Sequence, residues 1–283
     1  MPGTLYLVAT PIGNLGDMTP RAVQALTDAD LIAAEDTRRT LQLLNHFSIK
    51  GKLIHYDENN KEKQGPVLLQ ELLQGSDVAL VTDAGFPGIS DPGEAMAALA
   101  IQNGIAVVPV PGANACLTAL VASGLPSTPF FFGAFLPKSK KNRREQLEKW
   151  KGIPATVVLY EAPHRIVDAL EEILAAWGDR RMAFGRELTK IHEEFWRGTV
   201  SEAIAYLKEN TPRGEFVLVI ARGEEATGEM TAAEPGKAAD PLDMVKEKIA
   251  KGVPKKEALS EIAKQFKIPR RDLYNRLIQE QEK

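Results

Sequence analysis

Short apolar runs in the first part of the chain alternate with glycine-containing loops and with stretches of helical periodicity. Each run has the length and composition of a buried strand. The runs are residues 5–9, 31–34, 78–81 and 106–110. Helices are expected after the loops that follow, beginning near Thr19-Pro20, Asp91-Pro92 and Cys116. The alternation predicts a parallel sheet whose polar loops, residues 10–17, 82–93 and 111–114, meet at the carboxyl edge, where ligands bind.

The loop from Thr82 to Gly93 carries the strongest signal in the chain. We expect the preceding strand to end at Asp83, because the Asp, Gly and Pro residues that follow do not continue a ladder. Asp91 is expected to cap a helix that has Pro92 at its first position. The glycines let a ligand approach the main chain, and Asp83 places a carboxylate at the base of the loop. This combination favours a small, partly charged cofactor, and an ordinary structural turn is the alternative.

The pattern divides the chain into two α/β domains, a linker and a tail. The first domain is residues 1–113, and the second is residues 114–222. Strands in the second domain are expected at residues 130–132, 156–160, 181–184 and 216–220, and helices at residues 166–177 and 201–208. Residues 223–240 have no apolar periodicity and the composition of a flexible linker.

The tail, residues 241–283, differs from the rest of the chain in charge. It contains eleven Lys or Arg and seven Asp or Glu, a balance of +4, although the whole chain has a net charge of −3. Its apolar spacing predicts one helix over about 255–265, a turn at 267–269 and a second helix from about Arg270. This pattern is typical of a helix-turn-helix unit, which would contact nucleic acid or serve as a dimer arm. The glycine usual in such a turn is missing.

Composition excludes several classes of protein. No stretch approaches the roughly 20 apolar residues of a membrane span, and no basic region precedes an apolar one at the N-terminus, so we expect a soluble cytoplasmic protein. The only cysteine, Cys116, lies in an apolar helical stretch and is expected to be a buried small hydrophobic residue. The four histidines do not show the close spacing of metal ligands, and we expect no metal site.

A cluster of positive residues follows Pro137. Such clusters are often solvated loops or helix starts, but in an acidic protein this one favours contact with RNA phosphates. The candidate RNA-binding residues are Lys138, Lys140, Lys141, Arg143 and Arg144.

Six motifs occur in the order and spacing of a known family. They are LVATPIGNL at residues 7–15, AEDTR at 34–38, the 82–93 loop, PGANA at 111–115, YEAPHR at 160–165 and GRELTK at 185–190. On these motifs, residues 4 to about 222 resemble the 16S ribosomal RNA 2′-O-methyltransferases of the tetrapyrrole methylase superfamily. The resemblance implies two α/β domains with S-adenosylmethionine in the cleft between them, a homodimer, and methylation of a cytidine ribose in the decoding centre of the 30S subunit. Members that methylate tetrapyrroles usually carry a GDPxxYG-like second loop, whereas this chain has TDAGFP.

The resemblance also implies site residues. The cofactor contacts it implies are Pro11, Asp83, Ala84, Gly85, Ser90, Gly112, Ala113, Tyr160 and Leu218. The catalytic candidates are Glu35, Asp36, Arg38, Glu187 and Lys190. Glu35 and Asp36 follow the end of a predicted strand, and Glu187 and Lys190 have the i, i+3 spacing that would bring them together on a helix. A carboxylate at either of these two places could remove the ribose proton or orient the sugar. For both Glu187 with Lys190 and Asp36 with Arg38, an ordinary ion pair is the alternative, and Arg38 could instead bind a substrate phosphate.

Three hypotheses of function stay open at this point. The first is a ribosomal RNA ribose methyltransferase. The second is a methyltransferase of the same superfamily that acts on a tetrapyrrole or a protein and needs no phosphate anchor. The third is a non-enzymatic nucleic-acid-binding protein that uses the C-terminal helical pair. A dinucleotide-dependent oxidoreductase is disfavoured, because no GxGxxG follows a predicted strand.

Overall fold

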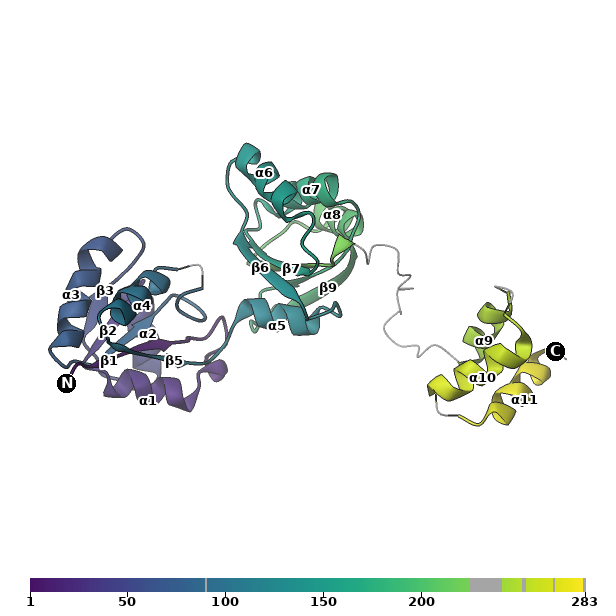
Figure 1. The fold of residues 1–283 in the computed structure, drawn as a ribbon, viewed down its shortest axis with the longest axis horizontal. Helices are drawn as coiled ribbons and strands as arrows, with labels where there is room; N and C mark the ends of the chain where they lie inside the picture. The colour runs from purple at the N-terminus through teal and green to yellow at the C-terminus, as the bar shows by residue number, and fades with distance from the viewer. Residues whose placement is uncertain (90, 224–240, 251–252, 267, 282–283) are drawn as a thin grey trace. The chain divides into compact units, whose positions relative to one another are not determined.

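The computed structural model describes residues 1–89, 91–223, 241–250, 253–266 and 268–281 (Figure 1). The chain separates into two compact units, Met1–Thr227 and Gly228–Lys283, and each is described by itself. The first unit contains two five-stranded sheets, and the second contains helices. The α/β fold class predicted from the sequence, with an additional small helical unit, is confirmed. The domain boundaries at residues 113 and 222 stay a prediction.

The first sheet is parallel throughout and has the strand order β3-β2-β4-β1-β5. Its strands are β1 (Thr4–Val8), β2 (Leu31–Ala34), β3 (Leu53–His55), β4 (Val78–Val81) and β5 (Ala106–Val110). The helices between them are α1 (Pro20–Asp28), α2 (Thr37–His46), α3 (Lys61–Leu73) and α4 (Gly93–Gln102), and a short 3₁₀ helix, η1, spans Leu15–Asp17. One core cluster contains residues of α3 and α4, and the other contains residues of α1 and α2. Helices therefore bury both faces of the sheet, as parallel sheets require.

The second sheet is mixed and has the order β6-β7-β10-β8-β9. Its strands are β6 (Phe130–Phe135), β7 (Thr156–Glu161), β8 (Arg181–Arg186), β9 (Glu194–Thr199) and β10 (Phe216–Ile220). The associated helices are α5 (Ala115–Ala122), α6 (Lys140–Trp150), α7 (Ile166–Trp177) and α8 (Val200–Glu209). The strands β6 and β7 pair in parallel. The other three pairs, β7 with β10, β10 with β8 and β8 with β9, are antiparallel.

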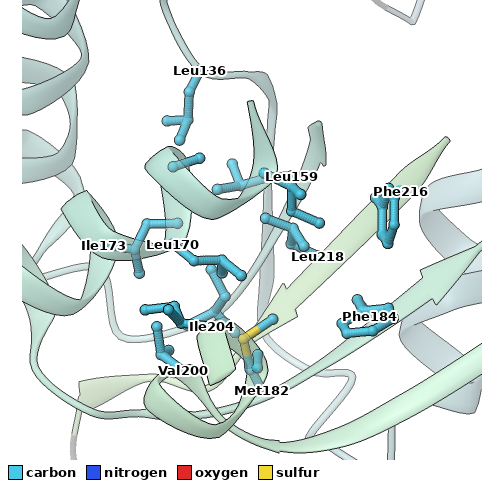
Figure 2. Packing of buried hydrophobic residues seen from close by; sticks show 14 of the residues in the cluster. Leu136, Leu159, Leu170, Ile173, Met182, Phe184, Val200, Ile204, Phe216 and Leu218 are labelled. Carbon is cyan, nitrogen blue, oxygen red and sulfur yellow. The ribbon is translucent and has the colours of Figure 1, made fainter. Parts of the chain in front are cut away.

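Alternate residues of the buried strands in this second sheet face two different cores. Leu159 and Leu218 pack with Leu170 and Ile173 of α7 in the larger core, which Figure 2 shows from close by. The residues next to them in sequence pack on the other face with α5. Because side chains alternate along a strand, a shift of one residue changes which face a side chain occupies. This alternation decides which residues of β10 can reach a ligand.

Two details of the first unit differ from the sequence prediction. β4 ends at Val81, and α4 begins at Gly93 with Pro92 at its N-cap, so Pro92 is not the first helical residue. Asp91 precedes this N-cap, and its carboxylate accepts hydrogen bonds from the N–H of Gly93, the first residue of α4, and from those of Gly88 and Ile89, so it both caps the helix start and closes the loop. The strand β9, which contains the charged residues Glu194 and Arg197, was not predicted from the sequence.

The second unit is a three-helix arrangement with its own core. Its helices are α9 (Pro241–Ala250), α10 (Lys255–Phe266) and α11 (Arg270–Gln281). The predicted helical pair corresponds to α10 and α11. The helix α9 was not predicted from the sequence, and its Leu242 and Val245 are buried against Ile262 and Leu273. The predicted linker falls on residues 223–240, of which residues 224–240 lie outside the described residues.

A buried ion pair joins α6 to α7. The Nε of Arg143 lies 2.6 Å from Oε2 of Glu172 and its Nη2 lies 3.1 Å from Oε1, a two-point contact between a guanidinium and a carboxylate. The two side chains are only 4% and 10% exposed. Arg143 is therefore not available to RNA, which corrects its place among the candidate RNA-binding residues.

We expect Arg143→Met to lower the free energy of unfolding by about 3 kcal/mol, because it leaves the Glu172 carboxylate buried without its partner. The double variant Arg143→Met, Glu172→Leu should recover most of this loss, because it removes both charges. Chemical denaturation of the three proteins measures both effects. A double variant no more stable than the single one would show that the loss comes from packing and not from the unpaired charge.

Candidate functional site

The loops that follow β1 and β4 are joined directly at the carboxyl edge of the first sheet. The N–H of Thr10 donates to the carbonyl of Gly85 at 2.9 Å, and the N–H of Gly85 donates to the carbonyl of Thr10 at 3.1 Å. Gly85 has φ +83°, a conformation that favours glycine, and a Cβ there would lie 3.4 Å from Ile12. Two of the three loops predicted to meet at this edge are thus tied together.

A hollow of about 530 Å³ lies beside this junction, and we call it the main hollow. Its size is within the range of small-molecule and cofactor sites. The first sheet contributes residues from the ends of β2 and β4, and the second contributes residues of β6, β7 and β10. The sequence-predicted residues in its wall are Glu35, Asp83, Ala84, Gly85 and Tyr160. The structure therefore brings residues of both sheets to one cavity.

Other predicted cofactor residues lie elsewhere. Pro11 lines a neighbouring hollow. Gly112 and Ala113 are half-buried and just precede two residues that do line the main hollow, Asn114 and Ala115. Ser90 lies outside the described residues.

The side chain of Leu218 does not line the main hollow. It is fully buried in the core formed with α7 and α8, on the face of β10 that points away from the hollow. Val217 is the residue of β10 that lines the hollow beside Phe216. Adjacent residues of a strand point to opposite faces, which is why the side chains of Val217 and Leu218 lie on different sides of the sheet.

Asp83 is held from two sides. Its Oδ2 accepts a hydrogen bond from Nη1 of Arg39 at 2.9 Å, and its N–H donates to Oε2 of Glu35 at 3.2 Å. Burial raises the pKa of Glu35 above its ordinary value, and the nearby carboxylates of Asp83, Asp91 and Asp57 act in the same direction. Glu35 is thus a carboxyl in the wall of the hollow that accepts a proton more readily than an ordinary glutamate.

Asp36 and Arg38 form the ordinary ion pair that the sequence analysis held open. Asp36 is the N-cap of α2 and accepts from the N–H groups of Arg38 and Arg39, while Nη2 of Arg38 lies 2.9 Å from its Oδ2. The side-chain hydrogen bond from Arg38 holds the pKa of Asp36 far below its usual range. Neither residue lines the main hollow.

Glu187 and Lys190 meet in a turn and not on a helix, contrary to the prediction. Glu187 and Thr189 both have positive φ, +50° and +66°, and this folds the chain so that Nζ of Lys190 lies 2.8 Å from Oε1 of Glu187. The same Nζ lies 2.8 Å from Oε2 of Glu215. The Lys190 hydrogen bond lowers the pKa of Glu187, so this carboxylate is a poor proton acceptor. Leu188 and Glu215 line the hollow, whereas Glu187 and Lys190 do not.

Aromatic side chains form one wall of the hollow. The hydroxyl of Tyr160 accepts a hydrogen bond from the N–H of Cys116 at 3.2 Å, and burial raises its pKa to about 12. Phe132 and Phe135 approach the Tyr160 ring edge to face, with centroid separations of 5.0 and 5.5 Å. Tyr160 is therefore a neutral, fixed surface and not a proton donor or acceptor near neutral pH.

Glu161 is a residue of the site that the sequence analysis did not single out, although it lies in the YEAPHR motif. It lines the hollow, and its side chain is fully buried. Its Oε1 accepts from the N–H of Ala162 at 2.9 Å and lies 3.4 Å from Nε of Arg165, while Oε2 has no hydrogen-bond partner among the described residues. Burial raises the pKa of Glu161. A buried acceptor without a partner is expected to be used by a ligand.

The four remaining members of the basic cluster, Lys138, Lys140, Lys141 and Arg144, are exposed at the start of α6. Within the described parts of the chain, no three His, Cys, Asp or Glu side chains are grouped so that they would hold a metal ion. Nor does any described helix have the length and apolar character to cross a membrane.

The sequence matches the family model described as Tetrapyrrole (Corrin/Porphyrin) Methylases over residues 4–204. The fold is similar to that of uroporphyrin-III C-methyltransferase from Thermus thermophilus in complex with S-adenosylhomocysteine, with a TM-score of 0.55 and 20% identity, covering 77% of this chain and 97% of that one. It is also similar to diphthine synthase, with a TM-score of 0.60 and 16% identity over 77% of this chain and 90% of the other. At these identities the likeness shows the fold alone.

Full-length relatives are much more similar in sequence. Proteins named ribosomal RNA small subunit methyltransferase I are 50% identical in Halalkalibacterium halodurans, 47% in Synechocystis and 46% in Bacillus subtilis. Each match covers 96% of this chain and between 93% and 96% of the relative. The chain therefore belongs to the ribosomal RNA small subunit methyltransferase I family of the tetrapyrrole methylases.

Proposed function

We propose that this protein transfers a methyl group from S-adenosylmethionine to the 2′-oxygen of a cytidine ribose in 16S ribosomal RNA. The observation that carries the proposal is the main hollow, whose wall combines the Asp83–Phe86 loop of the first sheet with Tyr160 and Glu161 of the second. The family relatives support ribosomal RNA of the small subunit as the substrate. That the methylated nucleotide is a cytidine, and that the substrate is the assembled 30S particle, are inferred from the resemblance of the motifs.

The residues of the main hollow fit S-adenosylmethionine. The carboxylate of Asp83 would hold the ammonium group of its methionine moiety, and the aromatic side chains of Phe135 and Tyr160 would contact its adenine. The free Oε2 of Glu161 would accept a hydrogen bond from a ribose hydroxyl or an amino group. Gly85 leaves room for a ligand to approach the main chain, and Val217 replaces Leu218 in the set of contacts.

When it is bound, this cofactor supplies a methyl group on a positively charged sulfur that is already activated for transfer. The protein must then place the ribose 2′-oxygen in line with that methyl group and remove the hydroxyl proton as the new O–CH₃ bond forms. Three carboxylates were candidates for this role. Asp36 and Glu187 are held by cations that lower their pKa values, whereas burial raises the pKa of Glu35. Glu35 is therefore the best general base of the three.

Two further properties belong to the proposal. The helix α5 exposes Leu117 and Val121, 48% and 75% accessible and four residues apart on one helix face, which supports a homodimer. A cytoplasmic location follows from the proposed substrate. The C-terminal unit, with Arg270, Arg271 and Arg276 on α11, is a second candidate for RNA contact.

A tetrapyrrole or a protein side chain is the second candidate substrate. Four exposed cations at the start of α6 favour RNA, because they can neutralise phosphates of an RNA backbone. Transfer of radiolabelled methyl groups separates these substrates. Label in ribose of unmodified 16S RNA or 30S subunits supports RNA, and cofactor binding without RNA labelling would favour the other two.

We expect Asp83→Asn to weaken binding of S-adenosylhomocysteine by about tenfold or more, because the ammonium group loses its charged acceptor. Titration calorimetry measures this affinity, and methyl transfer to 30S subunits should fall with it. Asp28→Asn is the matched control, because Asp28 is exposed on α1 and its carboxylate accepts from the side chain of Gln24. Unchanged affinity in Asp83→Asn would remove Asp83 from the cofactor site.

We expect Glu35→Gln to lower kcat by about 100-fold while the affinity for S-adenosylhomocysteine is unchanged. Since the pKa of Glu35 is raised above 4.5, the wild-type rate should fall as the pH drops through that higher value, where the carboxyl becomes protonated and can no longer accept the proton. The variant should lack this acid limb. Glu62→Gln, an exposed position in α3, is the control. An acid limb that persists in Glu35→Gln would assign it to another group.

We expect replacement of Lys138, Lys140, Lys141 and Arg144 by Gln to raise KM for 30S subunits without changing kcat. If these residues bind phosphates, the slope of log affinity against log salt should decrease by about 0.9 for each phosphate that the variant no longer neutralises. A variant with Arg21, Lys50, Lys52 and Lys63 changed to Gln removes the same charge from other exposed positions. Equal effects in the two variants would mean that only net charge matters.

A further inference from the structure

Three hollows meet at the side chain of Asp83. The first is the main hollow. The second, which we call the side hollow, has a volume of about 280 Å³ and lies between the loop after β1 (Thr10–Leu15) and the first turns of α2 (Arg39–Leu43). The third, which we call the acidic hollow, is lined by residues of the 35–38 and 55–59 segments. Asp83 lines all three, and Arg39 lines the main and side hollows.

Charge distinguishes the two hollows that adjoin the main hollow. The acidic hollow contains five carboxylates, those of Glu35, Asp36, Asp57, Glu58 and Asp83, against one arginine and one histidine. Phosphate groups are repelled by such a surface. The side hollow contains one carboxylate, that of Asp83, and one guanidinium, that of Arg39, and its other polar side chains are uncharged. A polyanion is therefore repelled by the acidic hollow and not by the side hollow.

We propose that the side hollow seats the nucleotide that is methylated, and that Arg39 binds the phosphate of this nucleotide once the cofactor has taken its place on Asp83. The inference rests on the proposed function and names the substrate subsite of that same site. The side hollow shares Thr82 and Asp83 with the main hollow, so a nucleotide seated there lies next to the bound cofactor. The exposed amide of Gln42 offers a donor and an acceptor to a base edge.

The ion pair between Arg39 and Asp83 would couple cofactor binding to RNA binding. In the structure, Nη1 of Arg39 donates to Oδ2 of Asp83 at 2.9 Å, and the two side chains are 67% and 31% exposed. Exposed pairs of this kind contribute little stability and are exchanged easily. An ammonium group bound to Asp83 would take over this carboxylate and leave the Arg39 guanidinium free for a phosphate, to which it can donate two parallel hydrogen bonds. Cofactor binding and RNA binding would then strengthen each other by the same factor.

Arg38, next to Arg39 on α2, is the competing candidate for the phosphate. It is 88% exposed, but it lies on the acidic hollow and is bonded to Asp36, which caps the helix and accepts two backbone N–H groups as well. The cofactor does not reach that pair, since neither residue lines the main hollow. Arg38 feels the charge of Asp83 but has no hydrogen bond to it that cofactor binding would release, so its response should be weaker than that of Arg39.

The test measures the affinity of the full-length protein for unmodified 30S subunits, with and without saturating S-adenosylhomocysteine. For the wild type we expect the cofactor product to tighten RNA binding by about tenfold. In Arg39→Gln, the affinity for S-adenosylhomocysteine should be kept or increased, while RNA binding stays weak and no longer responds to it. In Asp83→Asn, RNA binding without the cofactor product should already be tight, because Arg39 has lost its partner.

A second variant tests the hollow itself. Gln42→Trp fills the side hollow from an exposed position, and we expect it to raise KM for 30S subunits while the affinity for S-adenosylhomocysteine is unchanged. Gln24→Trp, exposed on α1, is the matched control. Thermal unfolding of each variant checks that the fold is intact.

Two results would overturn the inference. One is that S-adenosylhomocysteine tightens RNA binding by Arg39→Gln as much as by the wild type. The other is that this tightening is lost in Arg38→Gln and kept in Arg39→Gln. Failure of the proposed function is distinguishable, because the wild type would then bind no S-adenosylhomocysteine or label no RNA. If the wild type methylates RNA and Arg39→Gln has an unchanged KM for 30S subunits, the proposed nucleotide subsite is wrong while the proposed function stands.

Discussion

The site depends on the reciprocal backbone pairing of Thr10 with Gly85. These two hydrogen bonds fix the loop after β4 against the end of β1, and they need Gly85 in a conformation with φ +83°. Any side chain at this position would be strained and would also approach Ile12. Because Asp83 and Ala84 immediately precede the pairing, their position relative to the sheet edge is set by backbone hydrogen bonds and not by the packing of flexible side chains.

Identical carboxyl groups acquire different chemistry from their surroundings in this protein. Asp36 and Glu187 each receive a hydrogen bond from a cation, and their pKa values fall. Glu35 and Glu161 are partly or fully buried in the wall of the main hollow, and their pKa values rise. Environments that move pKa values apart are typical of sites with divided acid and base roles. In this protein, the carboxylates with lowered pKa values form ion pairs within the chain, and those with raised pKa values line the main hollow.

Much of the fold follows from patterns that act over short distances. The strands β4, β5 and β10 and the helix α7 occupy the residues that apolar runs and helical spacing predict. The polar loops of the parallel sheet meet at one edge because strand direction alone places them there. The predictions that failed concern features that depend on contacts between residues far apart in the sequence. The strand β9 is too polar to be recognised without its partner β8, and Arg143 looks like a surface cation until α7 brings Glu172 to it.

The candidate site shows the same division. Asp83, Gly85 and Tyr160 were predicted because the motifs that contain them are specific to a family, and the structure brings them to one hollow. The side chain of Leu218 points away from this hollow and that of Val217 points toward it, which only the register of β10 decides. Glu187 and Lys190 do meet, but through a turn with two positive φ angles that no periodicity predicts. Arg39 was not recognised at all, since its partner is 44 residues away.

The environment of Cys116 has a practical consequence. It is the only cysteine in the sequence, it is buried, and burial raises the pKa of its thiol to about 11. Maleimide and iodoacetamide react with the thiolate, which is scarce and shielded here near neutral pH. A cysteine introduced at an exposed position, such as one on α6 or α11, can therefore be labelled selectively in the otherwise unaltered chain. Dyes attached in this way would report on distances within the working protein without first removing a native residue.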